Sequence, residues 1–208
     1  MIKLTADGTT TIYSECFNQY YHSLFGARLE AEKVFIELGL DYALEKFAEV
    51  DILEMGFGTG FNALLTSQKA EEEKRQVDYT SLEAFPMEKE LEKGLNFDVQ
   101  HLHDMDWEVR IKVNDFFTLT KKKVTLEEYV SDKKFNLVYY DAFAPSSQPE
   151  LWTEEIFQRV AGFMNSGGVL VTYCSKSYVQ RNLRSAGFVV EKHQGPPRKR
   201  EVLRAILK

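Results

Sequence analysis

The chain has 208 residues, a formal net charge of −6 and an aromatic content of 13%, which together exclude a disordered or low-complexity protein. No apolar run approaches the roughly 20 residues that a bilayer span needs, so we expect no membrane association. The N-terminus lacks a basic stretch followed by an apolar core, so we expect no signal peptide and a cytoplasmic location. Two cysteines are too few for a disulfide framework.

The first 49 residues precede the first strong strand pattern. Within them an aromatic, loop-like segment leads into a run of apolar side chains at helical spacing, which predicts one amphipathic helix over residues 28–47. The apolar positions of that helix are Ala31, Phe35, Leu38 and Tyr42. No linker follows it, so we expect residues 1–49 to form an extension packed on a compact unit of residues 50–208.

From residue 50 onward, strand and helix patterns alternate along the chain. The expected strands cover residues 51–55, 78–83, 109–113, 135–140, 169–173, 188–192 and 202–207. The expected helices cover residues 61–74, 87–95, 124–130, 150–164 and 177–186. Such alternation is typical of a doubly wound α/β fold with a mostly parallel sheet. We therefore expect a seven-stranded sheet whose C-terminal strands pair as an antiparallel edge.

Acidic residues follow several of these strands. Ligands of such sheets bind beyond the carboxyl ends of the strands, near the point where the strand order reverses. A glycine-rich turn follows the first strand, and Glu83, Asp115 and Asp141 stand at or directly after the expected ends of three later strands. The sequence thus predicts one pocket at this edge, although each acid alone could be a solvated loop end.

The glycine-rich turn has a specific spacing. Glu54, Gly56, Gly58 and Gly60 form the pattern acid-x-Gly-x-Gly-x-Gly. Phe61 stands where a dinucleotide fingerprint needs its third glycine, and no Gly-Lys-Ser/Thr follows, which excludes a phosphate-binding Walker loop. The pattern resembles the nucleotide loop of class I S-adenosylmethionine methyltransferases.

This resemblance implies a Rossmann-like fold and S-adenosyl-L-methionine as the cofactor. Glu54 and the three glycines would then form the cofactor loop. Glu83 would bind the ribose hydroxyls of the cofactor, Asp115 would accept a hydrogen bond from the adenine amine, and Phe116 would pack on the adenine ring.

The segment after the fourth strand, residues 141–152, reads Asp-x-Phe-Ala-Pro-x-x-x-Pro-x-x-Trp. Asp141 should lie near the transferring methyl group, and Pro145 and Pro149 stiffen the loop behind it. The motif resembles the signature of the MnmC-type tRNA methyltransferases. Further resemblance to that family lies in residues 20–23, 26–36, 54–61, 83–86 and 187–201.

MnmC-type enzymes make the 5-methylaminomethyl group on the wobble uridine of certain tRNAs. The resemblance implies a tRNA N-methyltransferase that acts on the anticodon stem-loop, with Asp141 orienting the acceptor amine and receiving or relaying its proton. Phe143 or Tyr20 would stack on the flipped base, beside Pro145. Some family members carry a flavin oxidase domain, so here a separate flavin oxidase or wobble-uridine modification enzyme would be the partner. The chain departs from the family at Ala142, where glycine is usual, and at residues 146–148, which lack a lysine.

Charge is distributed unevenly along the chain. Nine Lys/Arg and two Glu give residues 174–208 a charge of +7, which leaves −13 on the preceding 173 residues. Such a basic end could steer a polyanion to one face or could simply be a solubilising surface. The candidates for contact with tRNA phosphate are Lys176, Arg181, Arg198, Lys199 and Arg200.

Other interpretations stay open at this point. His101 and His103, with Asp104 and Asp106, could hold a metal loosely, but a solvated loop is the simpler interpretation and we expect no metal. The same fold could serve a small-amine methyltransferase or an aminopropyltransferase, or a protein that binds S-adenosylmethionine without turnover.

Overall fold

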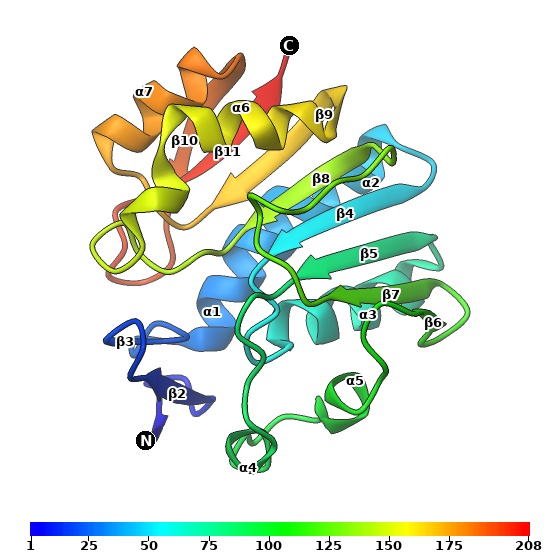
Figure 1. Ribbon diagram of the computed structural model, residues 1–208, viewed down its shortest axis with the longest axis vertical. Helices are drawn as coiled ribbons and strands as arrows, with labels where there is room; N and C mark the ends of the chain where they lie inside the picture. The colour runs from blue at the N-terminus through cyan, green and yellow to red at the C-terminus, as the bar shows by residue number, and fades with distance from the viewer.

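The computed structural model describes residues 1–208, and a mixed sheet of eight strands forms its centre (Figure 1). These strands are β4 (Val50–Met55), β5 (Val77–Leu82), β6 (Arg110–Lys112), β7 (Phe117–Lys122), β8 (Phe135–Tyr140), β9 (Met164–Thr172), β10 (Phe188–Gln194) and β11 (Glu201–Leu207). Their order across the sheet is β10-β11-β9-β8-β4-β5-β7-β6.

The strand order reverses between β4 and β8. Strand β4 pairs in parallel with both β5 and β8, so that Met55 lies opposite Leu82 on one side and Tyr140 on the other. The chain then extends through β7 on one side and through β9 on the other. The expected doubly wound fold is confirmed, and the carboxyl ends of β4, β5 and β8 meet at one edge.

Helices cover both faces of the sheet (Figure 1). They are α1 (Ala27–Ala31), η1 (Glu32–Asp41), α2 (Tyr42–Lys46), α3 (Phe61–Glu73), α4 (Lys89–Glu92), α5 (Gln100–His103), η2 (Pro149–Trp152), α6 (Glu154–Gly162) and α7 (Ser177–Ser185). Successive strand residues point to opposite faces. Ile52 therefore joins the apolar cluster under α3 and η1, whereas Leu53 joins the cluster under α6 and α7.

Residues 27–46 form one continuous helical stretch, as the spacing of its apolar residues predicts. Its middle segment, η1, has π-helical hydrogen bonding over ten residues. Gly39 lies against the sheet, since a Cβ atom there would come within 2.9 Å of Val171 Cγ2. The glycine allows the helix to approach the sheet closely. The N-terminal end of the helical stretch then lies beside the carboxyl ends of the strands, where Leu29 and Glu30 line the cavity described below.

A small antiparallel sheet precedes this helix, where the sequence predicted only a loop-like segment. It contains β1 (Ile2–Leu4), β2 (Thr10–Ser14) and β3 (Gln19–Tyr20). Asn96 fixes it to the main unit, because its side-chain oxygen accepts a 2.8 Å hydrogen bond from the Thr10 backbone N–H. No helix of the protein has the length and apolarity that crossing a membrane requires.

The sheet differs from the expected one in its third parallel strand. Residues 110–112 form the antiparallel edge strand β6, and the parallel strand is β7, which pairs with β5. The extra strand brings the count to eight. At the other edge β10 and β11 pair antiparallel as expected, but β11 lies inside the sheet, between β9 and β10. Residues 124–130 contain turns in place of the predicted helix.

Candidate active site

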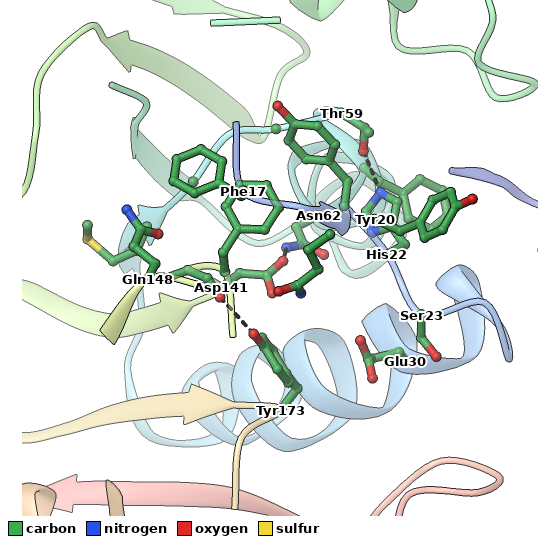
Figure 2. A pocket seen from close by; sticks show the side chains of 18 of the residues that line it. Phe17, Tyr20, His22, Ser23, Glu30, Thr59, Asn62, Asp141, Gln148 and Tyr173 are labelled. Atoms are coloured by element: carbon green, nitrogen blue, oxygen red, sulfur yellow. Dashed lines mark hydrogen bonds between the residues drawn. The ribbon is translucent and has the colours of Figure 1, made fainter. Parts of the chain in front are cut away.

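A cavity of about 630 Å³ lies at the carboxyl ends of the central strands. Its floor is formed by the glycine loop after β4 and by the residues that follow β5 and β8. Its walls come from both ends of the chain, residues 17–30 and residues 196–199. Figure 2 shows Asp141, Asn62 and Tyr173 grouped in this pocket, with Glu30 and His22 beside them. The predicted convergence of the strand ends therefore produces a real cavity.

The glycine loop adopts a backbone that other residues rarely take. Gly56, Gly58 and Gly60 have φ angles of 91°, 51° and 73°. A Cβ atom at Gly58 would also lie 3.0 Å from Tyr21 Cδ1, so only glycine fits there. Gly56 and Gly58 line the cavity, while Gly60 forms the N-cap of α3. The loop thus offers bare backbone to a ligand.

Glu83 anchors this loop from the end of β5. Its carboxylate accepts hydrogen bonds from the backbone N–H groups of Gly58, at 3.0 Å, and Phe85, at 2.9 Å. Burial raises the pKa of Glu83, and these two hydrogen bonds oppose that effect. Because a carboxylate can accept more than two hydrogen bonds, Glu83 keeps acceptor capacity toward the cavity that it lines.

Asp141 lies at the end of β8, beside the glycine loop, since a Cβ atom on Gly56 would come within 3.4 Å of the Asp141 carbonyl oxygen. Its Oδ2 accepts a 2.9 Å hydrogen bond from Asn62 Nδ2, which belongs to the first turn of α3. Burial raises the pKa of Asp141 well above its usual range, Glu30 and Glu54 raise it further, and Asn62 and Lys199 oppose the rise. Such a carboxyl binds a proton readily and ionises when a cation arrives.

Glu54 does not line the cavity. It is 1% exposed, and its Oε2 accepts a 2.6 Å hydrogen bond from Ser81 Oγ of the neighbouring strand. Burial raises its pKa to about 8. The structure therefore places this acid beneath the glycine loop, outside the cavity lining, where it can support the loop.

The prediction for Asp115 and Phe116 is wrong. Both lie in the turn between β6 and β7, at the amino end of β7 and so at the opposite edge of the sheet. Asp115 is exposed and pairs with Lys112 at 2.7 Å, whereas Phe116 packs on the core. The residues that follow β7 at the correct edge are 124–127, which line the cavity. The period-2 alternation of residues 117–122 was the sequence signal for β7.

Aromatic side chains gather at one side of the cavity. Phe143 stacks on Phe17, with ring centroids 4.3 Å apart and planes at 20°, and Tyr21 packs edge-on against Phe143 at 5.2 Å. Phe85 in turn meets Phe17 at 5.7 Å. Tyr20 also lines the cavity, but Pro145 does not. Sequence reasoning found Phe143 and missed Phe17, Tyr21 and Phe85, because only the fold brings them together.

A histidine joins the N-terminal extension to the glycine loop. His22 Nε2 lies 2.6 Å from the hydroxyl oxygen of Thr59. Burial lowers the pKa of His22 to about 4, so the ring is neutral at physiological pH. On the other side of the loop, His103 Nε2 lies 3.0 Å from the Thr59 carbonyl oxygen and Nδ1 lies 3.1 Å from Glu92. His103 therefore supports the loop rather than joining His101 in a metal site, and no cluster of three potential metal ligands is present.

The five basic candidates divide into two groups. Arg198 and Lys199 line the cavity, where Lys199 pairs with Glu30 and the Arg198 guanidinium lies 4.8 Å from the Phe25 ring. Lys176, Arg181 and Arg200 do not line the cavity and are exposed. Lys176 precedes α7 and Arg200 precedes β11, so both lie at the carboxyl edge, outside the pocket.

The chain is similar to several known proteins. A family model described as S-adenosyl-L-methionine-dependent methyltransferase matches residues 74–208. The tRNA 5-methylaminomethyl-2-thiouridine biosynthesis bifunctional protein MnmC of Pseudoalteromonas atlantica is 29% identical over 99% of this chain. The chain spans 33% of the length of that relative.

Two solved structures extend the comparison. MNMC2 from Aquifex aeolicus superposes with a TM-score of 0.80 at 26% identity, covering 100% of this chain and 70% of that one. The glycopeptide N-methyltransferase MtfA, complexed with sinefungin, gives a TM-score of 0.52 at 16% identity, covering 81% of this chain and 85% of that one. The second likeness concerns the fold alone.

Proposed function

Because the chain belongs to the family of S-adenosyl-L-methionine-dependent methyltransferases, we propose that it methylates the aminomethyl group of a modified wobble uridine in tRNA. The cofactor supplies an electrophilic methyl group on a positively charged sulfur. Similarity to MnmC and to MNMC2 supports the choice of tRNA as substrate. The observation that carries the proposal is the convergence of the glycine loop, Glu83 and Asp141 on one cavity.

We assign the cofactor to the floor of this cavity. The bare backbone of Gly56 and Gly58 allows close approach, and the spare acceptor capacity of Glu83 suits a pair of ribose hydroxyls. Residues 124–127 would flank the adenine in place of Asp115, since they follow β7 at the edge where the cavity lies. Asp141 would face the positively charged sulfur. These residues supply both the shape and the negative charge that the cofactor requires.

Asp141 would then act on the acceptor amine. The amine lone pair forms a new bond to the methyl carbon while the carbon–sulfur bond breaks and leaves its electron pair on sulfur. The acceptor arrives as an ammonium, so before the attack it must pass one proton to the Asp141 carboxylate, directly or through water. After the attack the nitrogen carries the positive charge that sulfur has lost. The raised pKa of Asp141 makes it a better proton acceptor than an exposed aspartate. Alignment of the two reactants supplies much of the remaining acceleration.

The acceptor base would enter from the aromatic side of the cavity. A wobble base must leave the anticodon stack to reach a recessed methyl group, and aromatic rings stabilise a base in that state. We propose Phe143 as the ring that receives the base, because it lines the cavity and is held by stacking on Phe17. The phosphates around it would contact the cations at the carboxyl edge, Lys176, Arg198, Lys199 and Arg200, and also Arg181 of α7.

The reaction also implies an earlier enzymatic step on the same uridine. Methylation consumes an aminomethyl group that another enzyme must already have installed, and we propose a separate flavin oxidase or wobble-uridine modification enzyme as that partner.

We also propose that residues 1–49 and 50–208 work as one unit, because residues 17–30 form part of the cavity wall.

The test compares two synthetic anticodon stem-loops that differ only at the wobble position, one with 5-aminomethyluridine and one with uridine. With isotope-labelled S-adenosylmethionine, label should appear only in the aminomethyl RNA. Label in a methylated small amine, with no RNA product, would instead indicate a small-amine methyltransferase, and aminopropyl transfer from the decarboxylated donor to a small amine would indicate an aminopropyltransferase. Bound cofactor with no labelled product in any acceptor would indicate a binding protein and would contradict the proposal.

A further inference from the structure

Two segments far apart in the chain meet beside Asp141 through an ion pair. Glu30 lies on α1, Lys199 lies in the turn between β10 and β11, and the Lys199 ammonium contacts the Glu30 carboxylate. The exposed fractions of these side chains are 15% for Glu30 and 32% for Lys199. Both residues line the cavity. The pair therefore belongs to the pocket wall and is accessible from inside the pocket.

An aromatic ring completes the surroundings of the lysine. The Lys199 ammonium lies 4.2 Å from the centroid of the Tyr173 ring, within the range of a cation–π interaction. The Tyr173 hydroxyl donates a 2.8 Å hydrogen bond to the Ala142 carbonyl oxygen, which fixes the ring next to Asp141 (Figure 2). A carboxylate and an aromatic ring thus surround one primary alkylammonium group.

This environment matches the chemistry of the acceptor. An aminomethyl group is also a primary alkylammonium near neutral pH, and a carboxylate with an aromatic face is a suitable receptor for such a cation. The negative charge is already concentrated there, because Glu30 and Asp141 lie close enough to interact. The niche, defined as Glu30 with the ring of Tyr173, is thus built for the same functional group that Lys199 carries.

We propose that the niche is the acceptor-amine subsite and that Lys199 occupies it as an internal stand-in until RNA arrives. The inference rests on the function proposed above. On binding, the aminomethyl ammonium replaces the Lys199 ammonium beside Glu30, so the net charge of the niche does not change. The released Lys199 becomes free to pair with an RNA phosphate. Glu30 thereby selects an amine over an uncharged substituent.

The experiment measures a preference ratio, the Kd of the uridine stem-loop divided by the Kd of the aminomethyluridine stem-loop. The protein is loaded with S-adenosylhomocysteine so that no turnover occurs. Contacts with phosphate, apart from that of the released Lys199, cancel in this ratio, because the two RNAs differ only in the aminomethyl group. We expect Glu30→Gln to lower the ratio about tenfold, as for loss of a charge-assisted hydrogen bond.

Lys199→Ala should change the ratio in the opposite direction. Removing the stand-in leaves Glu30 without its counter-ion, so the ammonium-bearing RNA should bind more tightly and the ratio should rise. Matched controls are Glu32→Gln, whose carboxylate pairs with Arg28 on the surface, and Lys192→Ala, whose ammonium pairs with Glu201 at 3.1 Å. Both controls should keep the wild-type ratio. Because the lysine variant tests the inference independently, a folding failure of Glu30→Gln would not prevent the test.

The outcomes separate this inference from the proposed function. If the wild-type protein neither methylates the aminomethyl RNA nor prefers it, the proposed function fails. If the wild-type protein does both while Glu30→Gln and Lys199→Ala leave the ratio unchanged, the function stands and the subsite is refuted. An unchanged ratio with loss of S-adenosylhomocysteine binding in both variants would assign the ion pair to the amino-acid end of the cofactor, which also overturns the proposal.

Discussion

At the scale of single residues, the acids at the strand ends determine what the site can do. Glu83 and Asp141 could be predicted because each directly follows a strand whose pattern is unmistakable, and the carboxyl ends of parallel strands share one edge. Asp115 could not be placed correctly, since its position depends on which half of a hairpin runs parallel to β5. Glu30 carries no local signal, because only the folded chain brings it to Lys199.

Asp141→Asn tests the role of the carboxylate. The amide keeps the size of the side chain but cannot take a proton, so methyl transfer should fall by about 10² to 10⁴. Cofactor affinity should change by less than about tenfold, since the glycine loop and Glu83 are untouched. Turnover on the aminomethyl stem-loop and calorimetric Kd values measure the two effects. Turnover close to that of the wild-type protein would remove Asp141 from the chemistry.

Cofactor binding should also depend on pH in a defined direction. The pKa of Asp141 is raised in the free protein, so below that pKa the carboxyl holds a proton, which a bound sulfonium should expel. Affinity for S-adenosylmethionine should therefore increase as the pH rises toward the free-protein pKa and then level off. Titration calorimetry in buffers of different ionisation enthalpy counts the released proton. Asp141→Asn should reduce this release, and equal release in both proteins would contradict the assignment.

Glu83 and Asp115 offer a matched comparison of two acids. Glu83→Gln should weaken S-adenosylmethionine binding about tenfold or more, because the cavity loses a charged acceptor. Asp115→Asn should leave the affinity unchanged, since this side chain is exposed at the opposite edge of the sheet and pairs with Lys112. Titration calorimetry on both variants measures the Kd for S-adenosylmethionine and so compares the two acids. A larger effect for Asp115→Asn would mean that the cofactor lies elsewhere.

At the scale of elements, the strands with strong apolar runs were predicted, whereas β7 was missed although its residues alternate between buried and partly exposed positions. Strands β4 and β8 are apolar on both faces and buried, so their pattern is plain in the sequence. Strand β7 ends in two lysines, and one of them, Lys121, is buried and donates a 2.8 Å hydrogen bond to the His103 carbonyl oxygen. Burial of a lysine is a tertiary event that local sequence does not reveal. It lowers the pKa of Lys121 to about 8.

The contact between η1 and the sheet makes a prediction about stability. Gly39→Ala would place a Cβ atom 2.9 Å from Val171 Cγ2 and 3.2 Å from Tyr139 Cε1, so the packed layers must shift. Overpacking of this kind should lower the free energy of unfolding by about 1–3 kcal/mol. Gly162→Ala is the matched control, because nothing lies within 4 Å of its added methyl. Urea denaturation that finds equal stability for the two variants would refute the close approach.

At the scale of the whole molecule, charge is separated between the two ends of the chain, and the fold brings part of the basic end to the pocket. The sequence predicted the asymmetry and the doubly wound topology. It did not predict that residues 17–30 and 196–199 would meet in the wall of one cavity, because those contacts join segments with no pairing signal. The composite wall explains why the aromatic side of the site was only partly foreseen.

This charge separation predicts a salt-dependent affinity for RNA. The logarithm of the association constant should fall linearly with the logarithm of salt concentration, because phosphate contacts release counterions. Arg198→Ala and Arg200→Ala should each reduce the slope by about one. Lys46→Ala should not, since it ends α2 just before β4 begins and so lies at the opposite edge. Fluorescence anisotropy over a series of salt concentrations would test this prediction. An RNA affinity that does not change with salt would exclude a phosphate-binding face.

The interior position of β11 has a consequence for how the protein is made. This strand inserts between β9 and β10, and it comes after both of them in the chain. Until β11 has formed, β10 has no partner in the sheet, because β11 is the strand that joins β10 to β9. Pairing of β11 also brings residues 196–199, which directly precede it, to the pocket. Competence to take up the methyl donor is consequently acquired only after β11 has been made, in the step that also joins β10 to the sheet.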